Sequence, residues 1–252
     1  MFHPSLHSVR NVLCLGAHSD DIEIGCGATL LQLLDHHPQV NIHWVVLSGT
    51  GPRSAEAAAS ADRFLSRGTG QHHFHQWNFT DSYFPAQWSR IKDDFHALSQ
   101  TVSPDLIFTH RGDDAHQDHR TVSELTWCAF RNHLVLEYEI AKYEGDLGQP
   151  NVYLPVSAEN ARTKCDLLLE CFASQRAKLW FDADTFQAML RLGGLESSSP
   201  SRFAEAFYCR KMALSLQSTD ESMSAADVCA SVAGGSAAGL AVPAGVGDAT
   251  AR

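Results

Sequence analysis

The pattern of apolar and polar positions alternates between short apolar runs and longer stretches with helical spacing. Short apolar runs are typical of buried parallel strands. We expect strands or extended segments at residues 11–17, 42–48, 71–77, 105–109, 138–141, 152–156 and 206–213. Apolar residues at helical spacing predict helices at residues 27–36, 53–67, 87–102, 118–133, 158–173 and 182–192. This alternation predicts an α/β fold with a Rossmann-like, doubly wound and mostly parallel sheet.

The composition changes near the end of the chain. Over the whole 252 residues, 44% are hydrophobic and 19% are charged, which is typical of a globular protein. From about residue 217 the sequence becomes rich in Ser, Ala and Gly and offers little to bury. We therefore predict a single domain over residues 1–216 and a disordered tail over residues 217–252.

The charge and the cysteines narrow the range of functions. A formal net charge of -10 argues against a nucleic-acid partner, which requires a cationic face. No apolar stretch approaches the roughly 20 residues of a membrane span, and the first residues do not resemble a signal peptide. The seven cysteines are scattered, mostly among apolar residues, as in proteins of a reducing compartment. We expect a soluble cytoplasmic protein that acts on a small molecule.

Two clusters of acidic and histidine residues follow predicted strands. His18-Ser19-Asp20-Asp21 comes directly after the run at residues 11–17, and Asp113-Asp114-Ala115-His116-Gln117-Asp118-His119 follows the run at residues 105–109. Open α/β sheets bind ligands at the carboxyl ends of their strands, so the clusters should meet at one edge. Ionisable groups crowded there are costly unless a charge compensates them. The two clusters therefore predict one metal site.

The residue types suit a metal that activates water. Such a metal uses about three protein ligands and keeps one position open. His18, Asp21 and His119 would supply two imidazoles and one carboxylate. Asp20 would remain beside the metal-bound water, where an unbound carboxylate can take its proton. We interpret Asp114 as a candidate partner of a ligand.

The second cluster also offers a proton donor. His116 lies three residues before His119 and shares its helical face, so its ring can point at the same cavity. Protonated, it would stabilise the oxyanion of a tetrahedral intermediate or give a proton to the leaving amine. Asp118 would hold that imidazole in one tautomer and raise its pKa, and it could also cap the helix. This arrangement favours metal-assisted hydrolysis of an amide or ester.

The two clusters together resemble the motifs of the LmbE-like or PIG-L deacetylases. Their first motif is His-Pro-Asp-Asp before a Gly-rich helix start, and residues 17–27 read Ala-His-Ser-Asp-Asp-Ile-Glu-Ile-Gly-Cys-Gly. Their second motif is His-x-Asp-His, which matches residues 116–119, and the resemblance covers about residues 12–213. Ser19 replaces the usual Pro, which leaves the loop less restricted in φ but removes no ligand, and Ala28 replaces a frequent second Gly.

The resemblance implies a zinc enzyme that removes an N-acetyl group from an N-acetylglucosamine-type moiety of a larger glycoconjugate. It implies zinc ligands at His18, Asp21 and His119, with Fe²⁺ as another candidate metal, and catalytic roles for Asp20, His116 and Asp118. Arg53, Glu56 and Asp81 resemble the family's substrate contacts: Arg53 would hold a phosphate or other polar aglycone, and Asp81 the sugar hydroxyls. Members of this family often form homo-trimers or hexamers, so a homo-oligomer is expected.

Several of these residues also have ordinary structural interpretations. Arg53 and Glu56 could form a helix-surface pair, and Asp81 could belong to a turn. We expect Glu23 to be a solvated charge at the entry of the helix. Three histidines at positions 72, 73 and 75 look like a second metal cluster, yet strand alternation sends His72 to one side and the other two to the opposite side.

Three other functions compete with sugar deacetylation. A related amidase could act on a thiol-sugar conjugate. A non-haem iron oxygenase would use His18, Asp20 and His119 as two histidines and one carboxylate, although the α/β alternation counts against it. A nucleotide-binding module would use Gly25-Cys26-Gly27 after a strand, but no third Gly follows at the required spacing and the acidic cluster would repel a pyrophosphate. The metal-dependent hydrolase is the prediction that the residues favour.

Overall fold

Seven strands form one sheet in the order β3-β2-β1-β4-β5-β7-β6 in the computed structural model, which describes residues 4–214. The strands are β1 (Asn11–Gly16), β2 (Asn41–Val46), β3 (His72–Gln76), β4 (Leu106–His110), β5 (Leu134–Tyr138), β6 (Val152–Pro155) and β7 (Ala204–Cys209). Strands β1 to β5 pair in parallel, whereas β7 runs antiparallel to both β5 and β6. The prediction of a doubly wound, mostly parallel sheet is confirmed.

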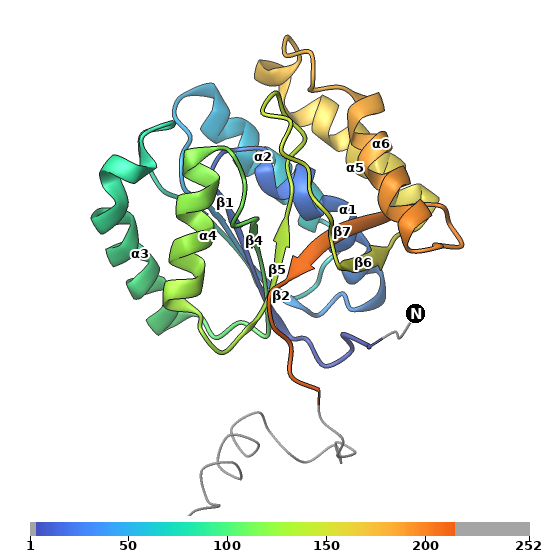
Figure 1. Cartoon of the computed structure of the whole chain (residues 1–252), viewed down its shortest axis with the longest axis horizontal. Coiled ribbons are helices and arrows are strands. Elements are labelled where there is room, and N and C mark those ends of the chain that lie inside the picture. Colours follow the sequence, from blue (N-terminus) through green and yellow to red (C-terminus); the bar gives the residue numbers. More distant parts are fainter. Residues whose placement is uncertain (1–3, 215–252) are drawn as a thin grey trace, which may run out of the picture. The chain divides into compact units, whose positions relative to one another are not determined.

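Helices cover both faces of this sheet (Figure 1). They are α1 (Asp21–His36), α2 (Pro52–Leu65), α3 (Trp88–Thr101), α4 (Gln117–Ala129), α5 (Ala158–Cys171) and α6 (Ala183–Glu196), with short 3₁₀ turns η1 (Phe84–Gln87) and η2 (Ala173–Gln175). Helices α3 and α4 lie on one face, and the other four lie on the opposite face. Side chains of β1 alternate between the two cores, because Val12 and Cys14 join one core and Leu13 and Leu15 join the other.

Helix α1 begins six residues earlier than the sequence pattern predicts. We expected it to start at residue 27, and glycine has a low helix propensity. The structure places both glycines inside the helix, where their missing side chains allow close packing: a Cβ at Gly25 would lie 2.2 Å from the ring of Tyr138, and one at Gly27 would lie 2.7 Å from the ring of Phe64. Asp21 is therefore the first residue of the helix and not a loop residue.

Two further expectations are wrong. Strand β5 covers residues 134–138 and not 138–141, because residues 134–138 pair in register with β4, and it contains the buried Glu137. Its carboxylate accepts hydrogen bonds from Trp127 Nε1 (2.6 Å), Gly112 N (2.9 Å) and Arg210 Nη2 (3.0 Å), so a charged residue fits within the strand. Glu23, expected to be solvated, is fully buried on α1.

The helices and strands of residues 4–214 all lie within one compact unit, which ends at Met212. Among the described residues, no helix combines the length and the apolar character that crossing a bilayer requires. The predicted tail at residues 217–252, together with the boundary that precedes it, lies outside residues 4–214.

A buried ion pair fixes α1, which carries Asp21, against α5 and β7. Glu205 accepts hydrogen bonds from the backbone N–H groups of Ala28 (3.0 Å) and Thr29 (2.6 Å). Lys164 donates to the carbonyl of Ile24 (2.6 Å) and pairs with Glu205. Both charged side chains are buried, so each depends on the other for compensation.

We expect the change Glu205→Ala to lower the free energy of unfolding by about 3–5 kcal/mol, because it leaves the ammonium of Lys164 buried without its partner. The exposed pair between Arg63 and Glu170 provides the matched control, and Glu170→Ala should change the same quantity by at most about 1 kcal/mol. Urea denaturation of the two variants and the wild type measures both values. Equal effects of the two changes would contradict the importance of the buried pair.

Candidate metal centre

The predicted ligands meet where the loops after two neighbouring strands separate. Strand β1 lies between β2 and β4; the chain leaves β1 into α1 on one face of the sheet and leaves β4 toward α4 on the other. Such a switch point opens a crevice at the carboxyl edge of the sheet. His18 lies in the loop after β1, Asp21 begins α1, and His119 lies in the first turn of α4.

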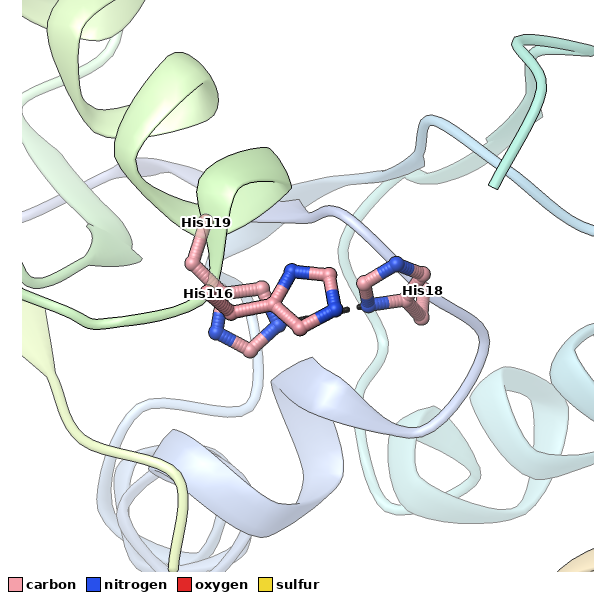
Figure 2. A group of neighbouring side chains, drawn as sticks. All are labelled: His18, His116 and His119. Atoms are coloured by element: carbon pink, nitrogen blue, oxygen red, sulfur yellow. Dashed lines mark hydrogen bonds between the residues drawn. The ribbon is translucent and has the colours of Figure 1, made fainter. Parts of the chain in front are cut away.

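Three side-chain atoms at this point form a nearly equilateral triangle. Nδ1 of His18 lies 3.3 Å from Oδ2 of Asp21, Nε2 of His119 lies 3.2 Å from Nδ1 of His18, and the third side measures 3.6 Å. Ligand atoms at about 2.0–2.1 Å from a tetrahedral Zn²⁺ stand roughly 3.3–3.4 Å apart. The triangle therefore has the dimensions of a three-ligand metal site, and the dashed line in Figure 2 marks the contact between the ring nitrogens of His18 and His119.

The carboxylate of Asp21 is the anionic centre of this group. Its Oδ2 accepts a hydrogen bond from the backbone N–H of His18 (2.7 Å) and faces three imidazoles. Burial alone would raise the pKa of Asp21, but His119, His110 and His18 hold it well below its usual range. In turn, burial would lower the pKa of His18, but Asp21, Asp118 and Asp81 together raise it well above the usual value.

His119 is oriented by a carboxylate behind it. Its Nδ1 lies 3.0 Å from Oδ2 of Asp114, so its Nε2 is directed at the triangle. Burial, followed by the neighbouring His110, lowers the pKa of His119 to about 4. The imidazole is therefore neutral near pH 7 and available as a ligand.

His110 also belongs to this site, although it was not among the predicted site residues. It is the last residue of β4, is fully buried, and stacks on His119 with 3.9 Å between ring centroids. Its Nε2 lies 3.1 Å from Oδ2 of Asp21 and accepts a hydrogen bond from Ala17 N at 3.0 Å. Asp21, His110 and His119 therefore form another set of converging ligand atoms. The position of His110 at the end of a predicted strand, close before the second cluster, was the sequence signal that could have identified this residue.

Asp20 lies beside the triangle without belonging to it. It is buried; Oδ1 lies 3.7 Å from Nη2 of Arg53, and Oδ2 has no hydrogen-bond partner within residues 4–214. Burial and the charge of Asp21 raise the pKa of Asp20, while Arg53 opposes this shift. Arg53 Nη1 also donates to Oδ2 of Asp81 at 3.0 Å, so the predicted contacts Arg53 and Asp81 reach the same site.

His116 points at the site, but its partner is not the predicted one. The ring of His116 lies 4.9 Å from that of His18, and its Nδ1 accepts a hydrogen bond from the backbone N–H of Asp118 (3.2 Å). His116, and not Asp118, is therefore the N-cap of α4. Burial and the charge of His18 lower the pKa of His116, whereas the sequence analysis expected Asp118 to raise it.

The side chain of Asp118 supports His18 instead. Its Oδ2 lies 3.3 Å from Nε2 of His18 and accepts a hydrogen bond from Ser82 N (2.6 Å), and its Oδ1 accepts one from Phe84 N (3.0 Å). Because α4 begins after its cap at His116, the side chain of Asp118 in the first turn faces the loop that contains Ser82.

A cavity of about 330 Å³ opens over the triangle. The predicted residues His18, Asp20, Asp21, Arg53, Asp81, His116 and His119 line it. The other part of the wall was not predicted, because it comes from segments without a motif; it includes Ile140, Lys142, Tyr143, Glu144, Lys178 and Trp180. The position of Glu56 does not support its predicted substrate contact: Glu56 is not among the lining residues, and it accepts hydrogen bonds from N (2.9 Å) and Oγ (2.5 Å) of Ser174.

The other histidines lie apart from this cavity. His73 and His75 stack on His43 of β2, with ring centroids 4.7 and 6.0 Å from it, so they share a face as alternation predicted. They do not appear among the groups of converging ligand atoms found within residues 4–214.

The half of the chain that contains both motifs is similar to known deacetylases. Residues 13–130 match the family model described as PIG-L: GlcNAc-PI de-N-acetylase. The "Uncharacterized deacetylase YaiS" of Escherichia coli K12 is 26% identical over 135 residues, which cover 50% of this chain and 71% of that protein. The predicted resemblance is thereby confirmed: the segment with both motifs matches the model of the PIG-L deacetylase family.

Solved structures share the fold over most of the chain. The N,N'-diacetylchitobiose deacetylase of Pyrococcus horikoshii has a TM-score of 0.55 and 17% identity, covering 80% of this chain and 84% of that one. GalB, the 4-carboxy-2-hydroxymuconate hydratase of Pseudomonas putida KT2440, has a TM-score of 0.62 and 15% identity, covering 83% and 99%. A deacetylase and a hydratase thus share this fold, so the fold alone does not determine the reaction, which depends on the residues of the site.

We expect metal binding to release about one proton per site near pH 7, because the carboxylates around His18 keep its imidazole protonated without metal. A metal must displace that proton, so affinity should rise with pH, by about tenfold per pH unit, until the pKa of His18 is passed. Isothermal titration calorimetry with Zn²⁺ in buffers of different ionisation enthalpy measures the proton count. Binding without proton release would show that His18 is already neutral.

Proposed function

We propose that this protein is a zinc-dependent N-deacetylase that hydrolyses the N-acetyl group of an N-acetylglucosamine-type moiety in a larger glycoconjugate. The observation that carries the proposal is the triangle of His18 Nδ1, Asp21 Oδ2 and His119 Nε2 at the floor of a cavity. The match of residues 13–130 to the deacetylase family model, together with the similarity to a protein named as a deacetylase, supports the reaction type.

The donor set fits zinc. Two imidazoles and one carboxylate with a fourth position open toward a cavity are typical of catalytic zinc sites, and the same donors also accept Fe²⁺. His18, Asp21 and His119 would hold the ion, with Asp114 and Asp118 fixing the two imidazoles from behind. When bound, the ion supplies Lewis-acid activation of water and of the amide carbonyl.

Asp20 is placed to act as the general base. Its Oδ2 is free of hydrogen bonds within the described chain and the residue lines the cavity, so it can accept the proton of an attacking water. A carboxylate whose pKa is raised holds that proton more firmly than an ordinary one and can pass it on to the leaving nitrogen.

His116 is placed to support the developing negative charge. Because the backbone N–H of Asp118 donates to its Nδ1, the neutral ring carries its proton on Nε2. The lowered pKa of His116 agrees with this neutral form. In this proposal Nε2–H donates a hydrogen bond to the oxyanion of the tetrahedral intermediate.

The wall of the cavity suits a sugar. Arg53 and Asp81 offer a charged donor and a carboxylate acceptor for polar substituents and hydroxyl groups. Across the cavity, Tyr143 and Trp180 offer aromatic surfaces on which the apolar face of a sugar ring can pack. The larger molecule to which that sugar is attached is predicted only as a glycoconjugate. The homo-oligomer and the cytoplasmic location also stay predictions.

The site argues against the non-hydrolytic alternatives. An iron oxygenase with Asp20 as ligand is disfavoured, because Asp21 and not Asp20 joins the converging ligand atoms. A nucleotide-binding role is disfavoured by the concentration of carboxylates where a pyrophosphate would lie. An amidase acting on a thiol-sugar conjugate uses the same chemistry, so it differs only in the substrate.

We expect the isosteric change Asp20→Asn to lower kcat by about 10²–10⁴-fold while leaving the metal bound, because it removes the base and no ligand. Acetate release is measured across N-acetylated nucleotide sugars, glycolipid precursors, thiol-sugar conjugates and antibiotic pseudosugars with defined metals. The matched change His119→Ala should lose activity together with metal, as measured by elemental analysis. Full activity of Asp20→Asn, or stoichiometric zinc in His119→Ala, would contradict the respective role.

We expect the change Arg53→Met to raise KM at least about tenfold and to move the acid limb of the kcat/KM profile to higher pH. The shift follows because Arg53 lowers the pKa of Asp20, so its removal leaves the base protonated over a wider range. Arg63→Met, an exposed position on the same helix, is the control and should change neither quantity. An unchanged pH profile in Arg53→Met would argue against Asp20 as the titrating base.

A further inference from the structure

Lys142 is a buried cation at the cavity wall for which the proposed chemistry has no role. It lies in the segment that follows β5, and only 8% of its side chain is exposed. Its ammonium forms an ion pair with Oδ1 of Asp114 (3.0 Å) and donates hydrogen bonds to both carboxylate oxygens of Asp146 (2.9 Å each) and to the carbonyl of Ile140 (3.3 Å). A buried ammonium persists only where its donors are satisfied, so these contacts hold Lys142 in one position.

One of its two carboxylate partners supports a candidate metal ligand. Asp114 uses Oδ1 for Lys142 and for the backbone N–H of His116 (2.7 Å), and Oδ2 for Nδ1 of His119 (3.0 Å). A carboxylate behind a ligand histidine fixes the direction of the ring and strengthens its donor atom. The ammonium of Lys142 is therefore two contacts away from the ligand atom of His119.

The other partner, Asp146, belongs to the segment that contributes to the wall of the cavity without lining the cavity itself. Asp146 accepts a hydrogen bond from Ala115 N (2.6 Å), and its carbonyl accepts one from Arg111 (2.8 Å). Residues 140–144 of the same segment contribute Ile140, Lys142, Tyr143 and Glu144 to the lining. Lys142 thus joins the wall of the cavity to the loop that precedes α4 and carries Asp114.

We propose that Lys142 is a positioning residue that couples the segment at residues 139–148 to metal binding at His119. The inference rests on the proposed function, because it requires an ion held by His18, Asp21 and His119. Simple Coulomb attraction gives the opposite expectation, since removing a positive charge near the site should strengthen cation binding. The sign of the change in metal affinity therefore separates positioning from a plain charge effect.

The test measures zinc affinity by competition with a chelator and hydrogen exchange of peptides from residues 139–148, with and without zinc. We expect Lys142→Met to bind zinc at least about tenfold more weakly, within the range for loss of a support behind a ligand. Zinc should slow exchange of this segment in the wild type and no longer do so in Lys142→Met. Lys142→Arg, which keeps the charge, should recover part of both effects.

Asp146→Asn is the matched control, because it keeps the ion pair between Lys142 and Asp114 and an amide oxygen that can accept the hydrogen bond from Ala115 N. It removes only the negative charge that residues 139–148 present to Lys142. Its zinc affinity should stay within about threefold of the wild type, while exchange of residues 139–148 becomes faster. The inference is overturned if Lys142→Met binds zinc as tightly as the wild type or tighter. If that variant does not fold, the inference is equally overturned when zinc leaves the hydrogen exchange of residues 139–148 unchanged in the wild type. A wild type that binds no divalent metal overturns the proposed function as well.

Discussion

The structure around the site depends on one buried carboxylate oxygen, Oδ2 of Asp21. It accepts a hydrogen bond from the backbone N–H of His18. It also faces the imidazoles of His18, His110 and His119, which come from three different parts of the chain. An isolated buried charge is very costly, so these groups must stay close to it. The oxygen consequently holds together the loop after β1, the end of β4 and the start of α4, and it fixes the dimensions of the triangle before any ion binds.

Much of this site could be predicted from the sequence because its parts follow simple rules. Both clusters come directly after buried strands, and parallel strands bring their carboxyl ends to one edge, so His18 and His119 had to approach each other. The start of α1 could not be predicted, because Gly25 and Gly27 are there for packing against Tyr138 and Phe64. Local helix propensity disfavours glycine, whereas these contacts depend on strands and helices distant in sequence.

The remainder of the site depends on long-range partners that no local pattern records. His110 resembles an ordinary residue at the end of a strand until its register beside β1 places it against Asp21. Lys142 lies in a segment without a motif, and its role emerges only from Asp114, which precedes it by 28 positions in the sequence. Glu137 lies inside β5, where its buried carboxylate accepts hydrogen bonds from Trp127 of α4 and from Arg210, which directly follows β7.

The balance of charge explains why these supports are needed. The carboxylate of Asp21 forms one corner of the triangle, and four more, those of Asp20, Asp81, Asp114 and Asp118, lie around it. Within residues 4–214, Arg53 and Lys142 are the Arg and Lys side chains that pair with these carboxylates. With neutral imidazoles the cluster would carry an excess of negative charge, and part of it is met by a proton on His18. A divalent ion would replace that proton and supply more positive charge, so the arrangement favours a cation at the triangle. It also leaves Asp20, which no ion pair shorter than 3.7 Å engages within the described residues, as the carboxylate free to accept a proton.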